Sequence, residues 1–360
     1  MKCTATAPSV TVLEGAYSID GFRSSYVVAK PEQPSSSDSA ASAPPPPIVL
    51  VHGFGSNKAH FTRNLEALAV STGSAVYALD LMGHGQSAKP QSVSYDCSLW
   101  DWQVEALVKD VIGEKAFVVG HSLGGYIAMR LAARSPRSVA GLCLIAPTGR
   151  YGVLHPLSFN VPFVSLDPVA NLLGEGTFDK FGTPQAMRST LEYLYQDPSK
   201  VSQELVDSLA APWQNAKSRE AGKAICKALY QSRLDQPWEK LISSDELRTV
   251  VTKRGRTGTS EESFITMTYC GPILTIWGSG DAYLPPETNV EAIRELRADD
   301  LCEIRMVDAG HCPHDEKPDE INAMIAQWVT KVHTEDAEFP IARKTRYRNS
   351  PIADETIFKI

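Results

Sequence analysis

Residues 118–126 read VVGHSLGGY and place a Gly-x-Ser-x-Gly pattern directly after an apolar run. The next stretch, Leu123–Arg134, has helical spacing and ends just before a proline. A serine between a strand and a helix needs a sharp turn, and Gly120 and Gly124 remove the side chains that would collide there. The pattern predicts that Ser122 is a nucleophile at a helix N-terminus, where the helix dipole favours developing negative charge. The alternative is a turn serine without a chemical role.

Short apolar runs alternate with helical stretches on both sides of this motif. Runs of this length and composition are typical of buried parallel strands joined by crossover helices, so we predict an α/β fold. The predicted strands are 48–52, 74–80, 116–120, 139–146, 272–277 and 302–307. The predicted helices are 60–71, 98–112, 123–134, 288–296 and 318–332. Residues 12–30 turn at Asp20-Gly21 and predict a β-hairpin.

The strand signal stops between residues 148 and 259, where the helical stretches are 184–195, 202–211 and 216–233. We therefore predict a core made of residues 12–147 and 260–332, with a helical cap over 148–259. Residues 31–47 form a low-complexity Ser/Ala/Pro loop, and residues 333–360 form a C-terminal tail of mixed charge.

Composition excludes several classes of protein. The chain has 360 residues and a net charge of −7, which argues against nucleic acid as the main partner. Its apolar runs are far shorter than the roughly 20 residues of a membrane helix, so no transmembrane segment is predicted. Seven cysteines without regular spacing predict free thiols in a reducing compartment. The first 15 residues lack an apolar signal core, and their composition fits the stub of an organelle transit peptide.

Residues 51–56, which read VHGFGS, follow the first predicted core strand. Acyl transfer produces a tetrahedral oxyanion, which needs two preorganised N–H donors. We expect one donor to be the N–H of Leu123, which follows the nucleophile, and the other to be the N–H of Phe54. The alternative is a strand-end turn in which His52 only packs.

Residues 309–316 read AGHCPHDE and follow the last predicted strand. A serine nucleophile needs a base, and histidine is the usual one. We expect His311 to be that base, because Gly310 gives it a tight turn directly after the strand, whereas His314 would brace the loop. A metal site at His311 and His314 is the alternative, although the spacing offers no third ligand.

Residues 276–285 read IWGSGDAYLP and place an acid after another strand. Asp281 lies between Ser122 and His311 in the chain, in the order Ser…Asp…His. Such an acid can hold the imidazole in one tautomer. The alternatives are a turn or N-cap role for Asp281, with Asp308 as a substitute acid. Asp80 also follows a strand, and we expect it to brace its glycine loop.

Five motifs in this order resemble the α/β-hydrolase superfamily: HGF at 52–54, DLMGHGQS at 80–87, GHSLGG at 120–125, GSGD at 278–281 and AGHCPH at 309–314. The resemblance covers about residues 12–332. It implies a mostly parallel eight-stranded sheet with an inserted helical cap over the site. It also implies that no metal or organic cofactor is required.

A narrower resemblance, carried by SLW at 98–100, SLGGY at 122–126 and AGHCPHDE at 309–316, is to the pheophytinase and chlorophyll dephytylase branch. It implies a serine ester hydrolase that acts on a large apolar ester, first of all the phytyl ester of a chlorophyll-type tetrapyrrole. It also implies a chloroplast location with peripheral membrane contact; a chain without a longer precursor would be cytoplasmic. The alternatives are a general carboxylesterase or C–C bond hydrolase on the same scaffold, or a non-catalytic hydrolase-like receptor.

Eight aromatic residues of the predicted cap suit an apolar substrate pocket, and the alternative is that they form the core of the cap itself. They are Phe159, Phe163, Phe178, Phe181, Tyr193, Tyr195, Trp213 and Trp238.

Overall fold

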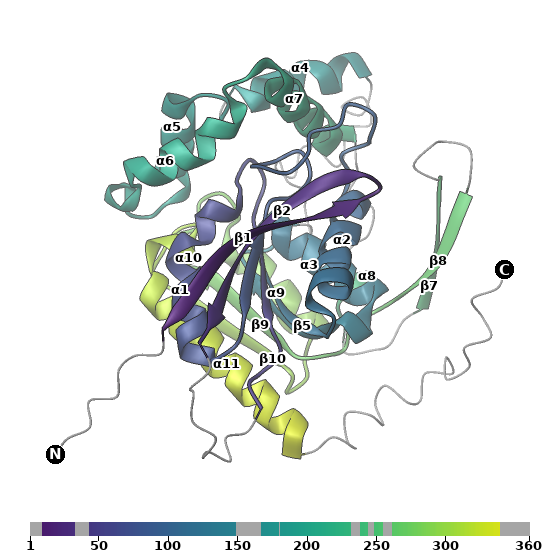
Figure 1. Ribbon diagram of the computed structural model, residues 1–360, viewed down its shortest axis with the longest axis vertical. Coiled ribbons are helices and arrows are strands. Elements are labelled where there is room, and N and C mark those ends of the chain that lie inside the picture. The colour runs from purple at the N-terminus through teal and green to yellow at the C-terminus, as the bar shows by residue number, and fades with distance from the viewer. Residues whose placement is uncertain are drawn as a thin grey trace.

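An eight-stranded sheet lies at the centre of the computed structural model, which describes residues 9–32, 43–148, 167–179, 181–231, 238–243, 248–254 and 261–338 (Figure 1). The strand order is β1-β2-β4-β3-β5-β6-β9-β10. The strands are β1 (Val10–Ile19), β2 (Phe22–Pro31), β3 (Ile48–Val51), β4 (Val76–Leu79), β5 (Ala116–His121), β6 (Val139–Ile145), β9 (Ile273–Gly278) and β10 (Cys302–Val307). From β4 to β10 every neighbouring pair is parallel, which confirms the predicted fold class.

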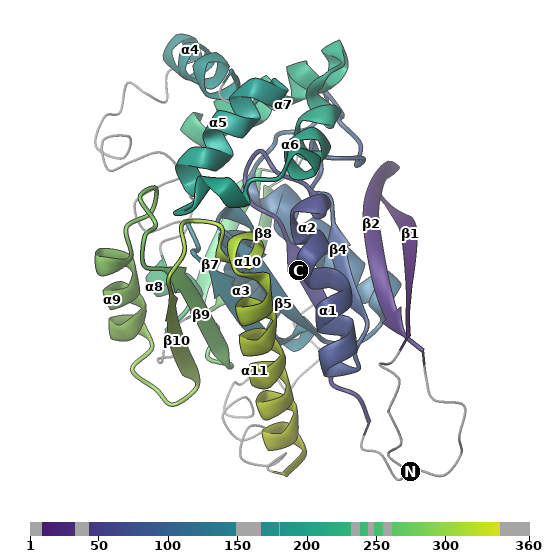
Figure 2. The same cartoon turned by 90° about the vertical axis from the view of Figure 1, so that its left-hand side faces the viewer.

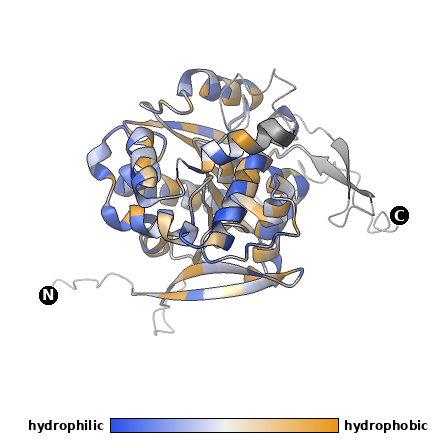
Figure 3. Ribbon diagram, turned by 90° about the horizontal axis from the view of Figure 1, so that it is seen from above, coloured by the Kyte–Doolittle hydropathy of each residue, from blue (hydrophilic) through white to orange (hydrophobic). Residues whose placement is uncertain are grey.

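The two N-terminal strands form the predicted antiparallel hairpin, and β2 continues the sheet antiparallel to β4. Asp20 and Gly21 at its turn have φ angles of 49° and 81°. Two positive φ angles are what a two-residue turn needs to match the twist of its strands. In the view from above, the hairpin lies along one side of the molecule (Figure 3). The helices in this view carry both hydrophilic and hydrophobic residues.

Helices cover both faces of the sheet (Figure 2). On one face, α1 (Thr62–Thr72) and α11 (Pro318–Glu338) share a buried cluster that includes Phe61, Leu68 and Trp328. On the other face lie α2 (Cys97–Ala106), α3 (Leu123–Arg134) and α9 (Pro286–Leu296). The shorter helices are η1 (Lys58–Phe61), η2 (Leu107–Ile112), η3 (Pro136–Ser138), η6 (Pro198–Lys200), η7 (Ala211–Trp213), α8 (Trp238–Leu241) and α10 (Pro313–Glu316).

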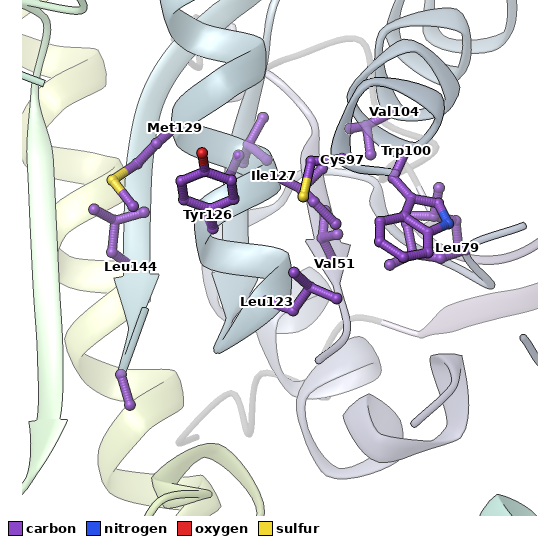
Figure 4. Close-up of a cluster of buried hydrophobic side chains, with 14 of the residues drawn as sticks. Val51, Leu79, Cys97, Trp100, Val104, Leu123, Tyr126, Ile127, Met129 and Leu144 are labelled. Atoms are coloured by element: carbon purple, nitrogen blue, oxygen red, sulfur yellow. The ribbon is translucent and has the colours of Figure 1, made fainter. Parts of the chain in front are cut away.

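Helix α3, which follows the Ser122 motif, is almost completely buried against the sheet. Figure 4 shows Leu123, Ile127 and Met129 of this helix among side chains of β3, β4, β6 and α2. Eleven of its twelve residues are buried, because α2 packs on its outer side. Its first turn is therefore fixed on all sides, which suits a helix that must present one residue at its start.

Four helices lie together above the carboxyl ends of the parallel strands (Figures 1 and 2). They are α4 (Asp167–Phe178), α5 (Pro184–Leu194), α6 (Gln203–Ala210) and α7 (Ala216–Gln231). Side-chain oxygens cap two of them: Thr183 accepts a hydrogen bond from Ala186 N–H, and Ser202 accepts one from Leu205 N–H.

The expectation that residues 148–259 contain no strand is wrong at one place. Residues Arg248–Arg254 form β7, which pairs with β8 (Glu261–Met267) in a separate two-stranded antiparallel sheet. The sequences RTVVTKR and EESFITM contain five and four polar residues of seven, unlike the apolar strands of the main sheet. A hairpin outside the main sheet does not need to be apolar on both faces, so the pattern used for the core strands missed it.

Two predicted segments lie largely or partly outside the described residues. Residues 33–42 of the low-complexity loop predicted at 31–47 lie outside the described residues. Residues 339–360 of the tail predicted from residue 333 also lie outside them. Helix α11 continues to Glu338, so the first six residues of the predicted tail are helical. The six cysteines within the described residues are not joined by disulfide bonds. No helix among the described residues is long and apolar enough to span a membrane.

Candidate active site

Ser122 occupies a strained turn between β5 and α3. Its φ of 52° is positive, a region that residues other than glycine rarely occupy. A Cβ atom added to Gly120 would lie 2.3 Å from the carbonyl oxygen of Gly124, and one added to Gly124 would lie 2.1 Å from that of Val51. Both contacts are with backbone, so only glycine permits this close approach of strand, turn and helix.

The backbone of Ser122 is held by several hydrogen bonds. Its N–H donates to Ile145 O at 2.9 Å, and its carbonyl oxygen accepts from Gly125 N–H at 3.0 Å and Thr148 N–H at 3.1 Å. The residue is 7% exposed. The strained conformation is therefore fixed by the end of β6, by the residues that follow it and by the first turn of α3.

His311 and Asp281 come together as a buried pair. The distance from His311 Nδ1 to Asp281 Oδ2 is 2.8 Å, and the two residues are 2% and 3% exposed. The other oxygen, Oδ1, accepts from the N–H groups of Tyr283 at 3.0 Å and Leu284 at 2.8 Å. Because a carboxylate only accepts, His311 carries its proton on Nδ1, which leaves a lone pair on Nε2.

Two other predicted motifs lie beside this pair. His121, the residue before Ser122, has its Nε2 2.9 Å from the carbonyl oxygen of His311, and the centres of the two rings are 4.9 Å apart. A Cβ added to Gly53 would lie 3.2 Å from Ser122 Cβ, so the VHGFGS loop also borders the serine. The predicted nucleophile, base, acid and oxyanion loop therefore lie at one place at the carboxyl ends of the strands.

The VHGFGS loop is braced by His52. Its Nδ1–H donates to Gly53 O at 2.7 Å, and its Nε2 accepts from Leu81 N–H at 3.0 Å. Complete burial lowers the pKa of His52 to about 4, so the ring is neutral at physiological pH. This fixes one tautomer and ties the loop to the end of β4.

The two predicted oxyanion donors occupy different positions. Leu123 is the first residue of α3, where an N–H has no acceptor within its own helix. Phe54 lies in the VHGFGS loop one residue after Gly53, and its half-buried ring contacts that of Phe181, with 5.2 Å between the ring centres.

The two acids set aside from the main prediction have other partners. Asp80 braces its loop as expected: Oδ1 accepts from Lys58 N–H at 2.8 Å, and Oδ2 accepts from Lys58 Nζ at 3.0 Å and Gln86 N–H at 2.8 Å. Asp308 accepts from the side-chain amide of Gln196 at 2.6 Å on the surface. The structure pairs His311 with Asp281 and not with Asp308.

Hydrogen bonds that the sequence did not predict join the end of α5 to the loop that carries His311. The N–H of His311 donates to Leu194 O at 2.7 Å. The buried carboxylate of Glu316 accepts from the N–H groups of Gly310 at 2.9 Å, Gln196 at 3.1 Å and Asp197 at 3.0 Å. Residues 194–197 and 310–316 are therefore joined through backbone groups. No pattern in the sequence could show this, because every donor is a main-chain N–H.

Residues able to hold a metal ion also lie close to the base, but not in the arrangement considered from the sequence. His311 pairs with Asp281, whereas His314 lies with His60 and His121 in a buried group of ring nitrogens. These three histidines come from three distant parts of the chain, so their spacing gave no signal.

Most of the described aromatic residues of the predicted cap belong to one buried cluster that they share with residues of the sheet and of α3. Within the described residues, Phe178, Phe181, Tyr195, Trp213 and Trp238 are buried, and Tyr193 is 60% exposed. Phe181 contacts both Phe178 and Trp213, with ring centres 5.2 and 5.7 Å apart. Phe159 and Phe163 lie outside the described residues.

Comparison with known proteins gives the same fold. The family described as alpha/beta hydrolase fold matches residues 46–318. Lipase 3 of Moraxella sp. is 25% identical over 267 residues, which cover 74% of this chain and 71% of that lipase. The chloroplastic pheophytinase of Arabidopsis thaliana is 24% identical over 336 residues, which cover 81% of this chain and 62% of that protein.

A third relative is the dihydrolipoyllysine-residue acetyltransferase component of the acetoin cleaving system of Cupriavidus necator. It is 26% identical over 280 residues, which cover 77% of this chain and 62% of that protein. The chain thus spans less than two thirds of the length of two of these relatives. Among solved structures, a bacterial membrane phospholipase A is similar in fold, with a TM-score of 0.62, 22% identity and coverage of 89% of this chain and 86% of the other.

Proposed function

Because the chain belongs to the α/β-hydrolase fold family, we propose that it is a serine hydrolase of large apolar esters. The observation that carries the proposal is the buried His311–Asp281 pair, 2.8 Å apart, beside the strained turn of Ser122. A nucleophile, a base and an orienting acid are the three parts that acyl transfer through serine requires.

In the proposed reaction, His311 Nε2 accepts the proton of the Ser122 hydroxyl while the oxygen attacks the ester carbonyl carbon. The resulting imidazolium is stabilised by Asp281, whose second oxygen stays engaged with two backbone N–H groups. His311 then gives the proton to the departing alcohol, and the acyl group remains on Ser122. Water attacks this acyl-enzyme through the same base and releases the acid.

The N–H groups of Leu123 and Phe54 stabilise the oxyanion in this proposal. Two features support that role: the position of Leu123 at the start of α3, and the contact of Gly53 with the serine. Donors held on a rigid backbone need no reorganisation when charge develops, and one such donor contributes about 10²–10³-fold to the rate. The reaction itself requires no metal or organic cofactor.

We propose the phytyl ester of a chlorophyll-type pigment as the substrate and the chloroplast as the location. The likeness to a chloroplastic pheophytinase supports both, and the aromatic cap residues against the VHGFGS loop suit a large apolar substrate. In this proposal the helices α4–α7 act as a cap over the site, and the core lies below them.

The test is the release of phytol from pheophytin a and from chlorophyll a, run beside hydrolysis of p-nitrophenyl butyrate. Purified wild type is compared with Ser122→Ala, which removes only the nucleophilic oxygen. We expect phytol release by wild type and loss of at least about 10³-fold in the variant. A fluorophosphonate probe should label wild type and leave the variant unlabelled.

The three possible outcomes separate the rival functions. Phytol release that depends on Ser122 supports the pigment esterase, and the ratio of the two pigments shows whether magnesium is tolerated in the substrate. Hydrolysis of the short ester alone would replace it with a general carboxylesterase. Labelling of Ser122 without turnover of any ester would overturn the proposal and favour a C–C bond hydrolase or a receptor.

A further inference from the structure

Three buried histidine side chains lie close to His311, the proposed base. His60 follows the VHGFGS loop, His121 ends β5 and His314 lies in α10, and they are 3%, 4% and 1% exposed. The ring of His314 is 4.5 Å from that of His60 and 4.4 Å from that of His121, measured between centres. One nitrogen from each ring lies within 4.8 Å of those of the other two.

Ring nitrogens of this group lack the partners that burial normally demands. Both nitrogens of His314 and Nδ1 of His121 have no hydrogen-bond partner among the described residues. Buried polar atoms are otherwise almost always paired, so an unpaired set needs an explanation. Burial also lowers the pKa of all three histidines, which keeps their rings neutral and their lone pairs available.

The tautomer of His121 follows from its partner. Its Nε2 lies 2.9 Å from the carbonyl oxygen of His311, which can only accept, so the proton is on Nε2. The unpaired Nδ1 therefore carries a lone pair. A histidine that donates one N–H to a backbone carbonyl and keeps the other nitrogen free has the arrangement typical of a metal ligand.

His60 differs from His121 in having a partner at each ring nitrogen. Tyr195 donates its hydroxyl to Asp315 at 2.7 Å, so its oxygen accepts from His60 Nε2–H at 3.4 Å. This places the lone pair of His60 on Nδ1, where the hydroxyl of Ser56 approaches at 3.1 Å. The chain from His60 through Tyr195 ends on a carboxylate, which would partly offset a positive charge among the rings.

We propose that His60, His121 and His314 bind one late first-row divalent metal ion of the Zn²⁺ type. Three imidazole nitrogens suit Zn²⁺, Cu²⁺ and Ni²⁺ better than harder cations. A tetrahedral ion about 2.1 Å from each nitrogen needs nitrogens roughly 3.4 Å apart. The nitrogens now lie within 4.8 Å of one another, so binding requires the rings to turn about their last side-chain torsion, which has a broad energy minimum.

The bound ion inhibits the proposed hydrolase, and this part of the inference rests on the proposed function. The ring of His121 lies 4.9 Å from that of His311, and His121 also holds the His311 carbonyl. Positive charge at this depth opposes formation of the His311 imidazolium during acyl transfer. We expect saturating metal to slow ester hydrolysis at least about tenfold.

Co²⁺ binding tests the site without any enzyme assay. Chelator-treated wild-type protein is incubated with Co²⁺, and the visible absorption of tetrahedral Co²⁺ is recorded with the metal content of the desalted protein. We expect one Co²⁺ per chain, displaced by Zn²⁺, and a higher unfolding temperature in its presence. Absence of the tetrahedral bands in wild type overturns the proposal, whatever the variants do.

His314→Phe and His84→Phe form a matched pair of variants. Both histidines are buried with both ring nitrogens unpaired among the described residues, but His84 packs near His52 and outside the group of three. We expect His314→Phe to weaken Co²⁺ binding by about 100-fold or more, while His84→Phe retains it. Equal binding by both variants would place the metal elsewhere and overturn the assignment.

Ester hydrolysis with and without Zn²⁺ then tests the inhibition separately. Zn²⁺-bound wild type that is as fast as chelator-treated protein would overturn the regulatory role. Because the Co²⁺ spectrum needs no substrate, a chain that hydrolyses no ester but binds one Co²⁺ at these residues would contradict the proposed function and retain the metal site.

Discussion

Replacing Asp281 by asparagine keeps the shape of the side chain but should move the proton of the His311 ring from Nδ1 to Nε2. The two backbone N–H groups of Tyr283 and Leu284 lie 3.0 and 2.8 Å from Asp281 Oδ1. In Asp281→Asn the amide oxygen must take that place, because an amide nitrogen there would face two N–H donors. The amide NH₂ then points at His311 Nδ1.

The magnitude follows from that choice of orientation. Turning the amide over would leave two buried N–H donors without acceptors, at about 1–3 kcal/mol each, or about 2–6 kcal/mol together. Even the lower figure favours the first orientation by roughly 30-fold at room temperature. His311 must then accept on Nδ1 and carry its proton on Nε2, where it cannot take a proton from Ser122. We expect kcat to fall about 10⁴-fold.

The assay is initial-rate hydrolysis of p-nitrophenyl butyrate at pH 7.5, with thermal unfolding as a check on the fold. Asp308→Asn is the control, because that carboxylate accepts only from the Gln196 side chain in the described structure and lies on the surface. We expect it to stay within about twofold of wild type, as surface substitutions usually do. A folded Asp281→Asn variant that keeps more than a tenth of the wild-type kcat would refute the reasoning.

Three further perturbations test the packing and the electrostatics. Gly124→Ala places a Cβ atom 2.1 Å from Val51 O, so we expect no folded protein by circular dichroism. The control variant Gly176→Ala should fold, because its added Cβ atom has no neighbour within 4 Å. Equal folding of the two variants would contradict the packing argument. Acid should destabilise the chain, because burial lowers the pKa of His52 to about 4 in the folded state, against 6.5 in the unfolded state. The contribution of the neutral His52 ring to the free energy of unfolding is complete above pH 6.5. About 3 kcal/mol of it is lost as the pH falls to 4. Urea unfolding at pH 7 and pH 4.5 measures this, and equal free energies of unfolding at the two pH values would show that the ring is not buried neutral. Trp213→Ala removes the ring that contacts Phe178 and Phe181 and should cost about 3–5 kcal/mol in the same urea assay, whereas a loss under 1 kcal/mol would mean that the fold does not depend on this buried aromatic cluster.

Strands that are apolar on both faces could be predicted from the sequence. The run at 116–120 appears as Ala116–His121, and the run at 139–146 appears as Val139–Ile145. Both are buried between two layers of helices, and this environment selects apolar residues at every position. The β7–β8 hairpin forms a separate two-stranded sheet, and its sequence contains no continuous apolar run.

Some residues of the candidate site could be predicted from the local sequence, whereas others come together only through the packing of distant segments. The Ser122 turn could be predicted because steric limits on glycine act within a few residues of the chain. Asp281 and His311 could be predicted because each follows a strand of one parallel sheet, whose carboxyl ends meet at one edge. The group of His60, His121 and His314 depends on how three distant segments pack, and no spacing rule records that.

The hydrogen-bonded junction around Glu316 limits how the protein can open. Leu194 O accepts a hydrogen bond from His311 N–H, and the Glu316 carboxylate accepts from the N–H groups of Gly310, Gln196 and Asp197. Any hinge that lifts the helices above the sheet must therefore bend before or after this segment. The end of α5 and the loop that carries His311 are therefore held as one unit, which helps to fix the position of the imidazole.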